Sequence, residues 1–183
     1  VINCAPENDQ CPNATTLLVN AEGGCPGGGT SGDNTYAGSV GDPPSCDTST
    51  AGFADVWYTF NSGASTTVLI DFEHGTMTDW GIAVTTACEG AEVACIVQPA
   101  SLVDVVVQPG TDYWIRVFSN LQFGAGGAFT ICLTGITQIC DGGVVSTVAA
   151  GTEPIVVCQD QQADVIDFIT SSTSTENYSF ILT

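Results

Sequence analysis

The sequence predicts an all-β protein built as a β-sandwich or jelly roll. No segment repeats apolar residues at helical spacing over three turns. β-Branched residues dominate the apolar segments, and several of these alternate apolar and polar side chains as a half-buried strand does. Clusters of glycine, proline, asparagine and aspartate separate the segments. About nine such segments follow one another, a number and spacing typical of a sandwich.

The first four expected strands occupy residues 15–20, 34–40, 55–60 and 66–73. The first is a run of threonine, leucine and valine, and the second ends before the turn-forming Asp-Pro-Pro sequence at 42–44. The third, Asp-Val-Trp-Tyr-Thr-Phe, combines aromatic and β-branched residues. The fourth alternates most clearly, because its apolar residues at even positions share one face while Asp71 and Glu73 share the other.

The next five expected strands occupy residues 81–86, 92–97, 102–107, 112–118 and 128–134. Turn-forming sequences at 108–110 and 124–127 separate the last three. Both faces of the strand at 112–118 are apolar, so core packing accounts for most of its aromatic residues. Trp114, Arg116 and Phe118 share one face, where the single arginine can stack between aromatic rings or pair with a carboxylate.

The pattern restarts after residue 137, and we expect two domains: a sandwich at 1–137 and a small β unit at 138–183. The second unit contains a segment bounded by two cysteines and two further strands, near 163–169 and 178–182. An independent immunoglobulin-like sandwich needs about seven strands, so we expect this unit to be incomplete. Either the sequence belongs to a larger protein, or another chain supplies strands that close the open edge.

The charge composition excludes two classes of partner. Asp and Glu number 20, against one arginine and no lysine, which leaves a net charge of −19. Such a polyanion repels phosphates and anionic headgroups, so we expect no binding to nucleic acid or to acidic membrane surfaces. No apolar run approaches the roughly 18 to 20 residues that span a bilayer, so we expect no membrane insertion.

Nine cysteines point to an oxidising compartment, and we expect a secreted, extracellular or cell-surface protein. We expect the disulfides Cys88–Cys95 and Cys140–Cys158. Four further cysteines are expected to form two more bonds of open connectivity: Cys11, Cys25, Cys46 and Cys132. Cys4 is then left over, as a candidate for an intermolecular disulfide, for a partner elsewhere in a longer protein, or for a free thiol.

The sequence offers little for catalysis. His74 is the only histidine and lies at an expected turn, where an exposed loop residue is the ordinary interpretation. Asp71 and Glu73 have a spacing that a glycosidase could use, but the flanking sequence lacks the clustered aromatic and polar residues of a sugar cleft. We therefore expect no catalytic residues and no enzyme activity.

Three acidic residues form a candidate calcium site. Asp71 and Glu73 point the same way from one strand, and Asp79 follows after a short turn. Calcium prefers six to eight oxygen ligands, which carboxylates and carbonyls supply. In a chain this acidic, the alternative is a solvated acidic face.

Five motifs occur in a fixed order between residues 3 and 137. They are Asn-Asp-Gln-Cys-Pro-Asn-Ala at 8–14, Asp-Val-Trp-Tyr-Thr-Phe at 55–60, the Cys88/Cys95 pair after Asp79, Pro-Gly-Thr-Asp-Tyr-Trp-Ile-Arg-Val at 109–117, and Phe-Thr-Ile-Cys at 129–132. Together they resemble the bacterial pre-peptidase C-terminal (PPC-like) domain, in the version found in large secreted and cell-surface proteins of the Bacteroidetes. Residues 138–183 are similar to part of an immunoglobulin-like repeat of such proteins.

The resemblance implies a non-catalytic module that is appended to secreted enzymes or repeated in adhesins and surface fibres. Some relatives hold calcium near the N-terminal Asn-Asp segment, which by analogy adds Glu7, Asp9 and Asp55 as a second candidate set. Our first hypothesis is a structural or adhesive extracellular module, in its sharpest form the subunit of a filament that self-associates by strand addition at the open edge of 138–183. The alternative is a calcium-dependent accessory module of a secreted enzyme that binds extracellular protein or polysaccharide.

Overall fold

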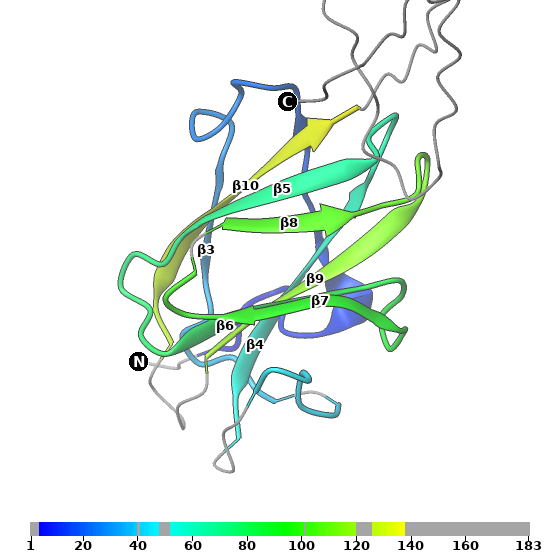
Figure 1. Ribbon diagram of the computed structural model, residues 1–183. Coiled ribbons are helices and arrows are strands. Elements are labelled where there is room, and N and C mark those ends of the chain that lie inside the picture. Colours follow the sequence, from blue (N-terminus) through cyan, green and yellow to red (C-terminus); the bar gives the residue numbers. More distant parts are fainter. Residues whose placement is uncertain (1–3, 40, 48–51, 101, 120–125, 138–183) are drawn as a thin grey trace, which may run out of the picture. The chain divides into compact units, whose positions relative to one another are not determined.

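The computed structural model describes residues 4–39, 41–47, 52–100, 102–119 and 126–137. They form two packed β-sheets (Figure 1), so the predicted all-β sandwich is confirmed. No helix in these segments has the length and apolar character needed to cross a membrane. The expected unit at 138–183, with its Cys140–Cys158 bond and its open edge, lies outside the described residues, and the domain boundary stays a prediction.

The first sheet contains five strands in the order β1 (Thr15–Thr16), β4 (Ala54–Asn61), β9 (Asp112–Ser119), β6 (Trp80–Thr85) and β7 (Glu92–Val97). The second sheet has the order β2 (Val19–Asn20), β10 (Ala128–Ile136), β5 (Thr67–Glu73) and β8 (Leu102–Val106), and β3 (Thr30–Asp33) also pairs with β10. Only β1 and β2 pair in parallel with their neighbours among these strands. A single 3-10 turn, η1 (Cys11–Asn13), precedes β1.

Every strand expected between residues 55 and 134 is present, as β4 to β10, with ends shifted by at most two residues. The expected strand at 15–20 is instead two short strands in different sheets, because buried Leu17 lies where the chain crosses between them. A sequence pattern shows that a residue is apolar and will be buried. It does not show in which of the two sheets the flanking residues find their partner strands.

The expected strand at 34–40 is wrong, and β3 lies just before it. The Asn34 side chain is buried, donates to the Ala54 carbonyl over 3.0 Å and accepts from the Gly127 N–H over 2.9 Å. Tyr36 adopts a φ of 65°, in the left-handed region that a strand does not use. The buried amide thus replaces the strand ladder with a turn.

The core lies between the sheets and is built by alternation. Side chains at even positions of β4 and β5 and at odd positions of β9 and β10 point inward, including Val56, Phe60, Ile70, Phe72, Ile115, Val117, Ile131 and Leu133. The Phe72 ring lies 4.6 Å from Trp80 and 5.2 Å from Phe129 between centroids. Full burial of one such side chain contributes about 1.5–3 kcal/mol, so the core holds both sheets in fixed register.

The opposite face of the first sheet also carries large side chains. The strand register places Trp57, Arg116 and Ala83 in one row and Asp55, Phe118 and Gly81 in the next. A Cβ atom on Gly81 would lie 2.3 Å from the Phe118 ring, so only glycine lets that ring pack over β6. Phe118 is fully buried, which shows that loops cover this outer face.

Three disulfides link the described residues: Cys11–Cys88, Cys25–Cys132 and Cys46–Cys95. The expected Cys88–Cys95 bond is therefore wrong. The hairpin between those cysteines closes by backbone hydrogen bonds, from Thr86 to Ala91 over 3.0 Å and from Gly90 to Ala87 over 3.0 Å, and each cysteine bonds to a distant segment instead.

Of the two bonds expected among Cys11, Cys25, Cys46 and Cys132, only Cys25–Cys132 forms within that group. Cys4 is exposed and is the one unpaired cysteine of the described segments. An intermolecular bond at Cys4 stays a prediction.

Candidate ligand-binding pocket

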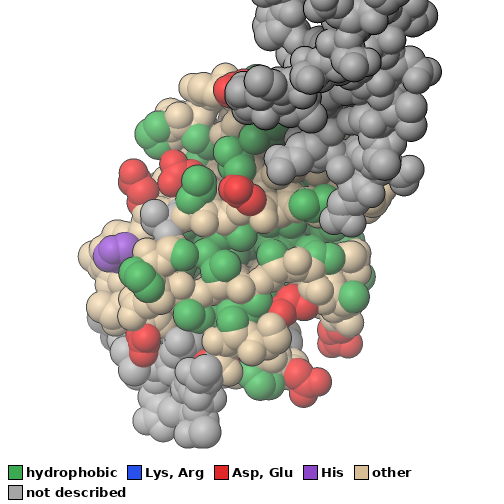
Figure 2. Space-filling model, in the orientation of Figure 1, with side chains coloured by type: hydrophobic (Ala, Val, Ile, Leu, Met, Phe, Trp, Pro, Cys, Tyr) green, Lys and Arg blue, Asp and Glu red, His purple; other side chains and the backbone are tan. Residues whose placement is uncertain are grey.

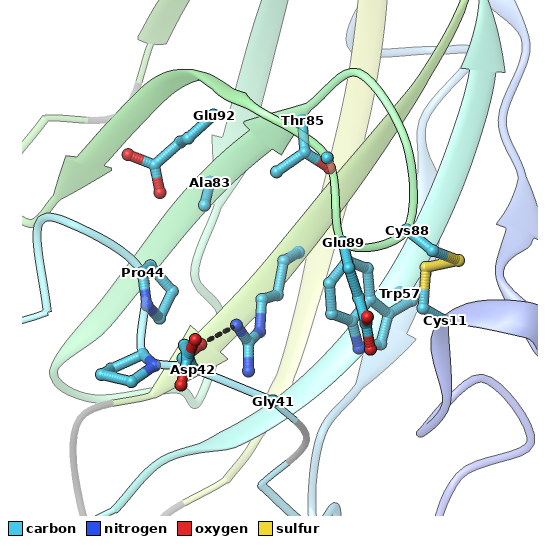
Figure 3. Close-up of a pocket in the computed structure, with 13 residues that line it drawn as sticks. Cys11, Gly41, Asp42, Pro44, Trp57, Ala83, Thr85, Cys88, Glu89 and Glu92 are labelled. Carbon is cyan, nitrogen blue, oxygen red and sulfur yellow. Dashed lines mark hydrogen bonds between the residues drawn. A yellow bond between two sulfur atoms is a disulfide. The ribbon is translucent and has the colours of Figure 1, made fainter.

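The outer face of the first sheet carries a pocket of about 460 Å³. Its floor comes from the row Trp57, Arg116 and Ala83, on the three central strands β4, β9 and β6. One wall is the segment 41–44, with two prolines, and the other is the β6–β7 hairpin (Figure 3). Concave sites of a few hundred Å³ are the usual size for small-molecule ligands.

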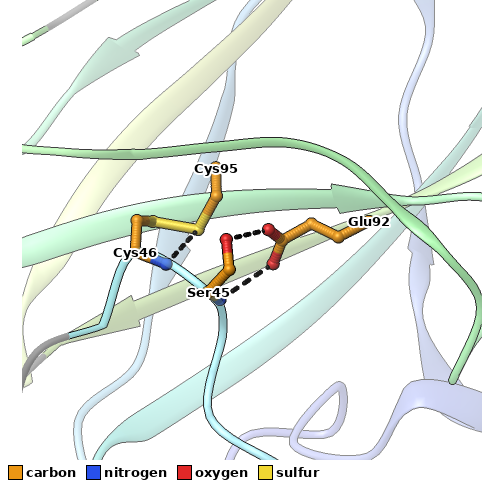
Figure 4. The surroundings of a disulfide bond; sticks show 4 residues. All are labelled: Ser45, Cys46, Glu92 and Cys95. Carbon is orange, nitrogen blue, oxygen red and sulfur yellow. Dashed lines mark hydrogen bonds between the residues drawn. A yellow bond between two sulfur atoms is a disulfide. The ribbon is translucent and has the colours of Figure 1, made fainter.

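Disulfides hold both walls in place. Cys11 and Cys88 line the pocket themselves, and their bond ties the hairpin to η1. Cys46–Cys95 ties the opposite wall to β7, where the Cys46 N–H donates to the Cys95 sulfur over 3.2 Å (Figure 4). Beside it, Ser45 donates from its N–H to Glu92 Oε2 over 3.1 Å and from its hydroxyl to Oε1. The pocket is therefore preformed rather than assembled by mobile loops.

Arg116 is the chain's only basic residue apart from His74, and it is buried under the pocket. Its guanidinium carbon lies 4.3 Å from the Phe53 ring centroid and 5.0 Å from that of Trp57. Nε donates to Asp55 in an ion pair, and Nη1 donates to the Asp42 carbonyl over 2.7 Å. Ring stacking and carboxylate pairing, the two roles predicted from sequence, both occur; the rings, however, come from outside β9.

Asp55, the partner of Arg116, has no exposed surface. Its Oδ1 has no hydrogen-bond partner in the described structure. Burial raises the pKa of Asp55 from its ordinary 3.8 to about 7, because desolvation outweighs the lowering effect of Arg116, and nearby Asp9 adds to the increase. The pair beneath the pocket therefore changes charge near neutral pH.

This pKa predicts how stability depends on pH. A carboxyl group whose pKa is higher in the folded than in the unfolded chain favours folding most at a pH below both values, where it is protonated in both states. This contribution is lost as the pH rises through the pKa of the folded state. Each tenfold difference in proton affinity between the folded and unfolded states corresponds to about 1.4 kcal/mol. We therefore expect Asp55 to lower the free energy of unfolding by up to about 4 kcal/mol between about pH 4 and about pH 7. In denaturant unfolding experiments, the Asp55→Asn variant should not show this decrease of the free energy of unfolding with pH.

Glu22→Gln is the matched control for that experiment, because Glu22 is exposed and lies in a loop away from the pocket. Its pH slope should equal that of the unaltered protein. An Asp55→Asn slope that matches them both would contradict the assignment.

Three exposed acidic residues line the pocket: Asp42, Glu89 and Glu92. Glu92 is engaged by Ser45, whereas Glu89 forms no hydrogen bond or ion pair with another described residue. Trp57, the prolines and the Cys11–Cys88 bond supply apolar lining. The pocket thus presents a carboxylate acceptor beside apolar surface, an arrangement suited to a ligand that carries several hydroxyl groups.

Asp71, Glu73 and Asp79 do not form the expected calcium cage. No group of three or more such side chains able to hold a metal occurs within the described segments. Asp71 and Glu73 are on β5 in the second sheet, whereas Asp79 precedes β6 in the first and accepts from Gln98 Nε2 over 3.2 Å. The chain changes sheets between them, which separates the carboxylates.

The second expected set, Glu7, Asp9 and Asp55, is also not assembled. Asp55 pairs with Arg116, and the two Asp9 oxygens accept from the Gly38 N–H and from Gln10 Nε2. His74 is an exposed loop residue, as expected, with Nδ1 3.1 Å from the Met77 carbonyl oxygen.

Sequence reasoning missed Glu89 and the pocket itself. Glu89 lies between Cys88 and Cys95, but it becomes a pocket residue only because both cysteines bond to distant segments. One feature of the sequence could have indicated the pocket: Trp57 and Arg116 occupy positions that face away from the core, on strands that were predicted correctly.

Comparison with known proteins identifies the family to which the chain is similar. A family model for T9SS-associated domains, described as galactose binding domain-like, matches residues 7–131. Among solved structures, the chain is similar to the pre-peptidase C-terminal domain of a collagenase from Bacillus anthracis, with 13% identity and a TM-score of 0.43, over 72% of this chain and 99% of that one. No curated protein matches the chain.

Proposed function

Because the chain belongs to the T9SS-associated, galactose-binding-domain-like family, we propose that it is a non-enzymatic accessory module that binds a neutral glycan in the pocket above Trp57 and Arg116. The PPC-like resemblance of its motifs, of the Bacteroidetes type, is confirmed at the level of the family. Family and disulfides together identify an extracellular accessory module. Glycan binding itself is the proposal.

One observation carries this proposal: the pocket is preformed, with its walls bonded covalently to the sheet and to η1. A rigid site spares the ligand the entropic cost of ordering loops. A sugar ring packs its C–H face against the apolar lining while its hydroxyl groups donate to the Glu89 carboxylate. The volume of about 460 Å³ accommodates one or two sugar units.

Charge supports a neutral glycan over an acidic one. The rim carries Asp42, Glu89 and Glu92, and the whole chain carries −19. Above about pH 7, where Asp55 is ionised, the positive charge of Arg116 beneath the pocket is paired with it. Uronic or sulfated sugars would bring a further negative charge against these carboxylates, which costs binding free energy.

One of the three carboxylates in the pocket has a structural role. A glycosidase needs two carboxylates that act as acid and base or nucleophile. Glu92 accepts two hydrogen bonds from Ser45, which fix it as part of the wall. Glu89 on the hairpin and Asp42 on the opposite wall remain, and we propose binding rather than hydrolysis because the family model describes a binding module.

Changing Glu89 to glutamine should weaken binding of a neutral oligosaccharide about tenfold or more. The substitution replaces charge-assisted hydrogen bonds, worth about 1.5–3 kcal/mol, with neutral ones. Isothermal titration on a panel of neutral and acidic oligosaccharides measures the affinity. Glu22→Gln makes the same charge change outside the pocket and should bind as the unaltered protein does.

Two results would contradict this proposal: equal loss of affinity in Glu89→Gln and Glu22→Gln, or no binding to any neutral oligosaccharide of the panel. Running the titration with calcium and again with a chelator tests the calcium dependence that the sequence led us to expect. Calcium-dependent binding would require ligands other than the two acidic sets named from the sequence.

The filament hypothesis depends on the strand edge of residues 138–183, which lies outside the described residues. Exposed Cys4 is compatible with it. Self-association through that edge stays a prediction, and it is independent of the pocket.

A further inference from the structure

Among the strands of the described segments, β8 offers a long edge with no further strand paired to it. On the first sheet, β1 has two residues, and β7 is covered where Cys46 bonds to Cys95 and Ser45 bonds to Glu92. On the second sheet, β2 has two residues and β3 is the polar sequence Thr-Ser-Gly-Asp. β8 has five residues, Leu-Val-Asp-Val-Val, and ends its sheet. It contains neither the lysine nor the proline that usually blocks an edge.

The backbone of β8 is oriented for pairing. The Val107 N–H donates to the Thr66 carbonyl over 2.9 Å, which makes these two residues a hydrogen-bonded pair of the antiparallel ladder with β5. Because such pairs alternate along a ladder, Val105 and Val103 also bond toward β5. The N–H and C=O groups of Leu102, Asp104 and Val106 therefore point away from β5, toward the open edge.

The side chains of the same three residues form an exposed pattern. Leu102 is 54% exposed and Val106 is 78% exposed, whereas Val103 and Val105 between them are buried. Asp104 lies between the two apolar residues on the exposed face. Figure 2 shows hydrophobic side chains along this side of the molecule with acidic ones among them, and no Lys or Arg.

We propose that the edge of β8 binds an extended segment of a partner protein by strand addition, and that this segment carries a lysine or arginine between two apolar residues. Main-chain hydrogen bonds to an edge supply affinity, and alternate side chains supply specificity. The apolar residues pack beside Leu102 and Val106, and the cation lies opposite Asp104. Opposite-charge cross-strand pairs are favourable, while like charges directly opposite each other are unfavourable.

Charge argues against a second copy as the occupant. Two copies pairing antiparallel about the centre of β8 would place Asp104 opposite Asp104, between molecules that each carry −19. The chain has no lysine, and its single arginine is buried. A basic extended segment, in contrast, is complementary both to Asp104 and to the protein as a whole.

A synthetic peptide tests the proposal. It has lysine at its centre, valine two positions before and two positions after the lysine, and threonine at the positions between them, so that the two valines and the lysine share one face of the extended chain. In NMR titrations we expect it to shift the amide signals of Leu102, Asp104 and Val106. Replacing the central lysine with glutamate should weaken binding at least tenfold. Asp104→Lys should do the same for the lysine peptide, whereas Glu22→Lys, with the same charge change in a distant loop, should lower affinity far less.

Val106→Pro is the second variant, because it removes an outward N–H without removing a hydrogen bond to β5. It should keep its melting temperature within a few degrees and lose peptide binding. No peptide binding at millimolar concentration overturns the proposal, and so does an equal loss in Asp104→Lys and Glu22→Lys. A dimer in sedimentation velocity that Val106→Pro dissociates would make a second copy the occupant and overturn the proposed partner.

Discussion

Replacing Arg116 with methionine should lower the free energy of unfolding by about 3–5 kcal/mol at pH 8, the usual cost of removing one partner of a buried ion pair. The substitution leaves the fully buried Asp55 carboxyl without its cation, so it must either stay charged unpaired or take up a proton at a pH where the unaltered protein keeps it ionised. It also removes the stacking of the guanidinium on Phe53 and Trp57 and the hydrogen bond to the Asp42 carbonyl. Methionine fills much of the same volume, so little of the loss comes from a cavity.

A double variant separates charge from packing. Asp55→Asn combined with Arg116→Met removes both charges, and it should be considerably more stable than Arg116→Met alone, because no uncompensated charge remains. Lowering the pH to 5 should also reduce the cost of Arg116→Met, since the buried carboxyl then takes up a proton. Urea unfolding at both pH values compares the unaltered protein, Arg116→Met, Asp55→Asn and the double variant. Equal destabilisation of the single and double variants would contradict this account of the pair.

Removing the Cys25–Cys132 disulfide by paired alanine substitutions should lower the free energy of unfolding by about 2–5 kcal/mol. The bond joins residues 107 positions apart, and cross-links that close long loops remove the most entropy from the unfolded chain. It lies on β10 in the second sheet, away from the pocket. Well below the melting temperature, glycan affinity should therefore be unchanged.

The Cys46–Cys95 bond provides the matched comparison. Its loop spans 49 positions, so its removal should destabilise the fold by a similar amount. This bond, however, holds a wall of the pocket, and paired alanine substitutions there should also weaken glycan binding severalfold. Unfolding curves combined with titrations measure both effects. The same loss of glycan affinity in both disulfide variants would contradict the assignment of this wall.

The strands from β4 to β10 could be predicted because each has a strong local pattern. In β5, alternation separates Ile70 and Phe72, which are buried, from Glu73, which is exposed. The N-terminal region lacked such a pattern. There the outcome depended on single buried residues, Leu17 between two sheets and Asn34 in a turn, whose partners lie far along the chain.

The disulfides show the same limit. The sequence contains nine cysteines and so predicts an oxidising compartment, but the pairing of Cys88 with Cys95, expected from their closeness along the chain, was wrong. Bond formation requires closeness in space, which the sheet register decides. The acidic candidates failed for a related reason: Asp71 is on β5 in the second sheet, whereas Asp79, close in sequence, lies just before β6 of the first.

The sequence by itself determined the all-β class, most of the strands, the acidic character and the single arginine available to pair with a carboxylate, because each depends on composition or on a period of two residues. Tertiary structure alone decided the pocket, the disulfide partners and the open edge of β8. These features arise where segments far apart along the chain meet, as the separations of 49 and 107 positions across two of the disulfides show. The strand order within each sheet, and the loops that run beside it, bring those segments together.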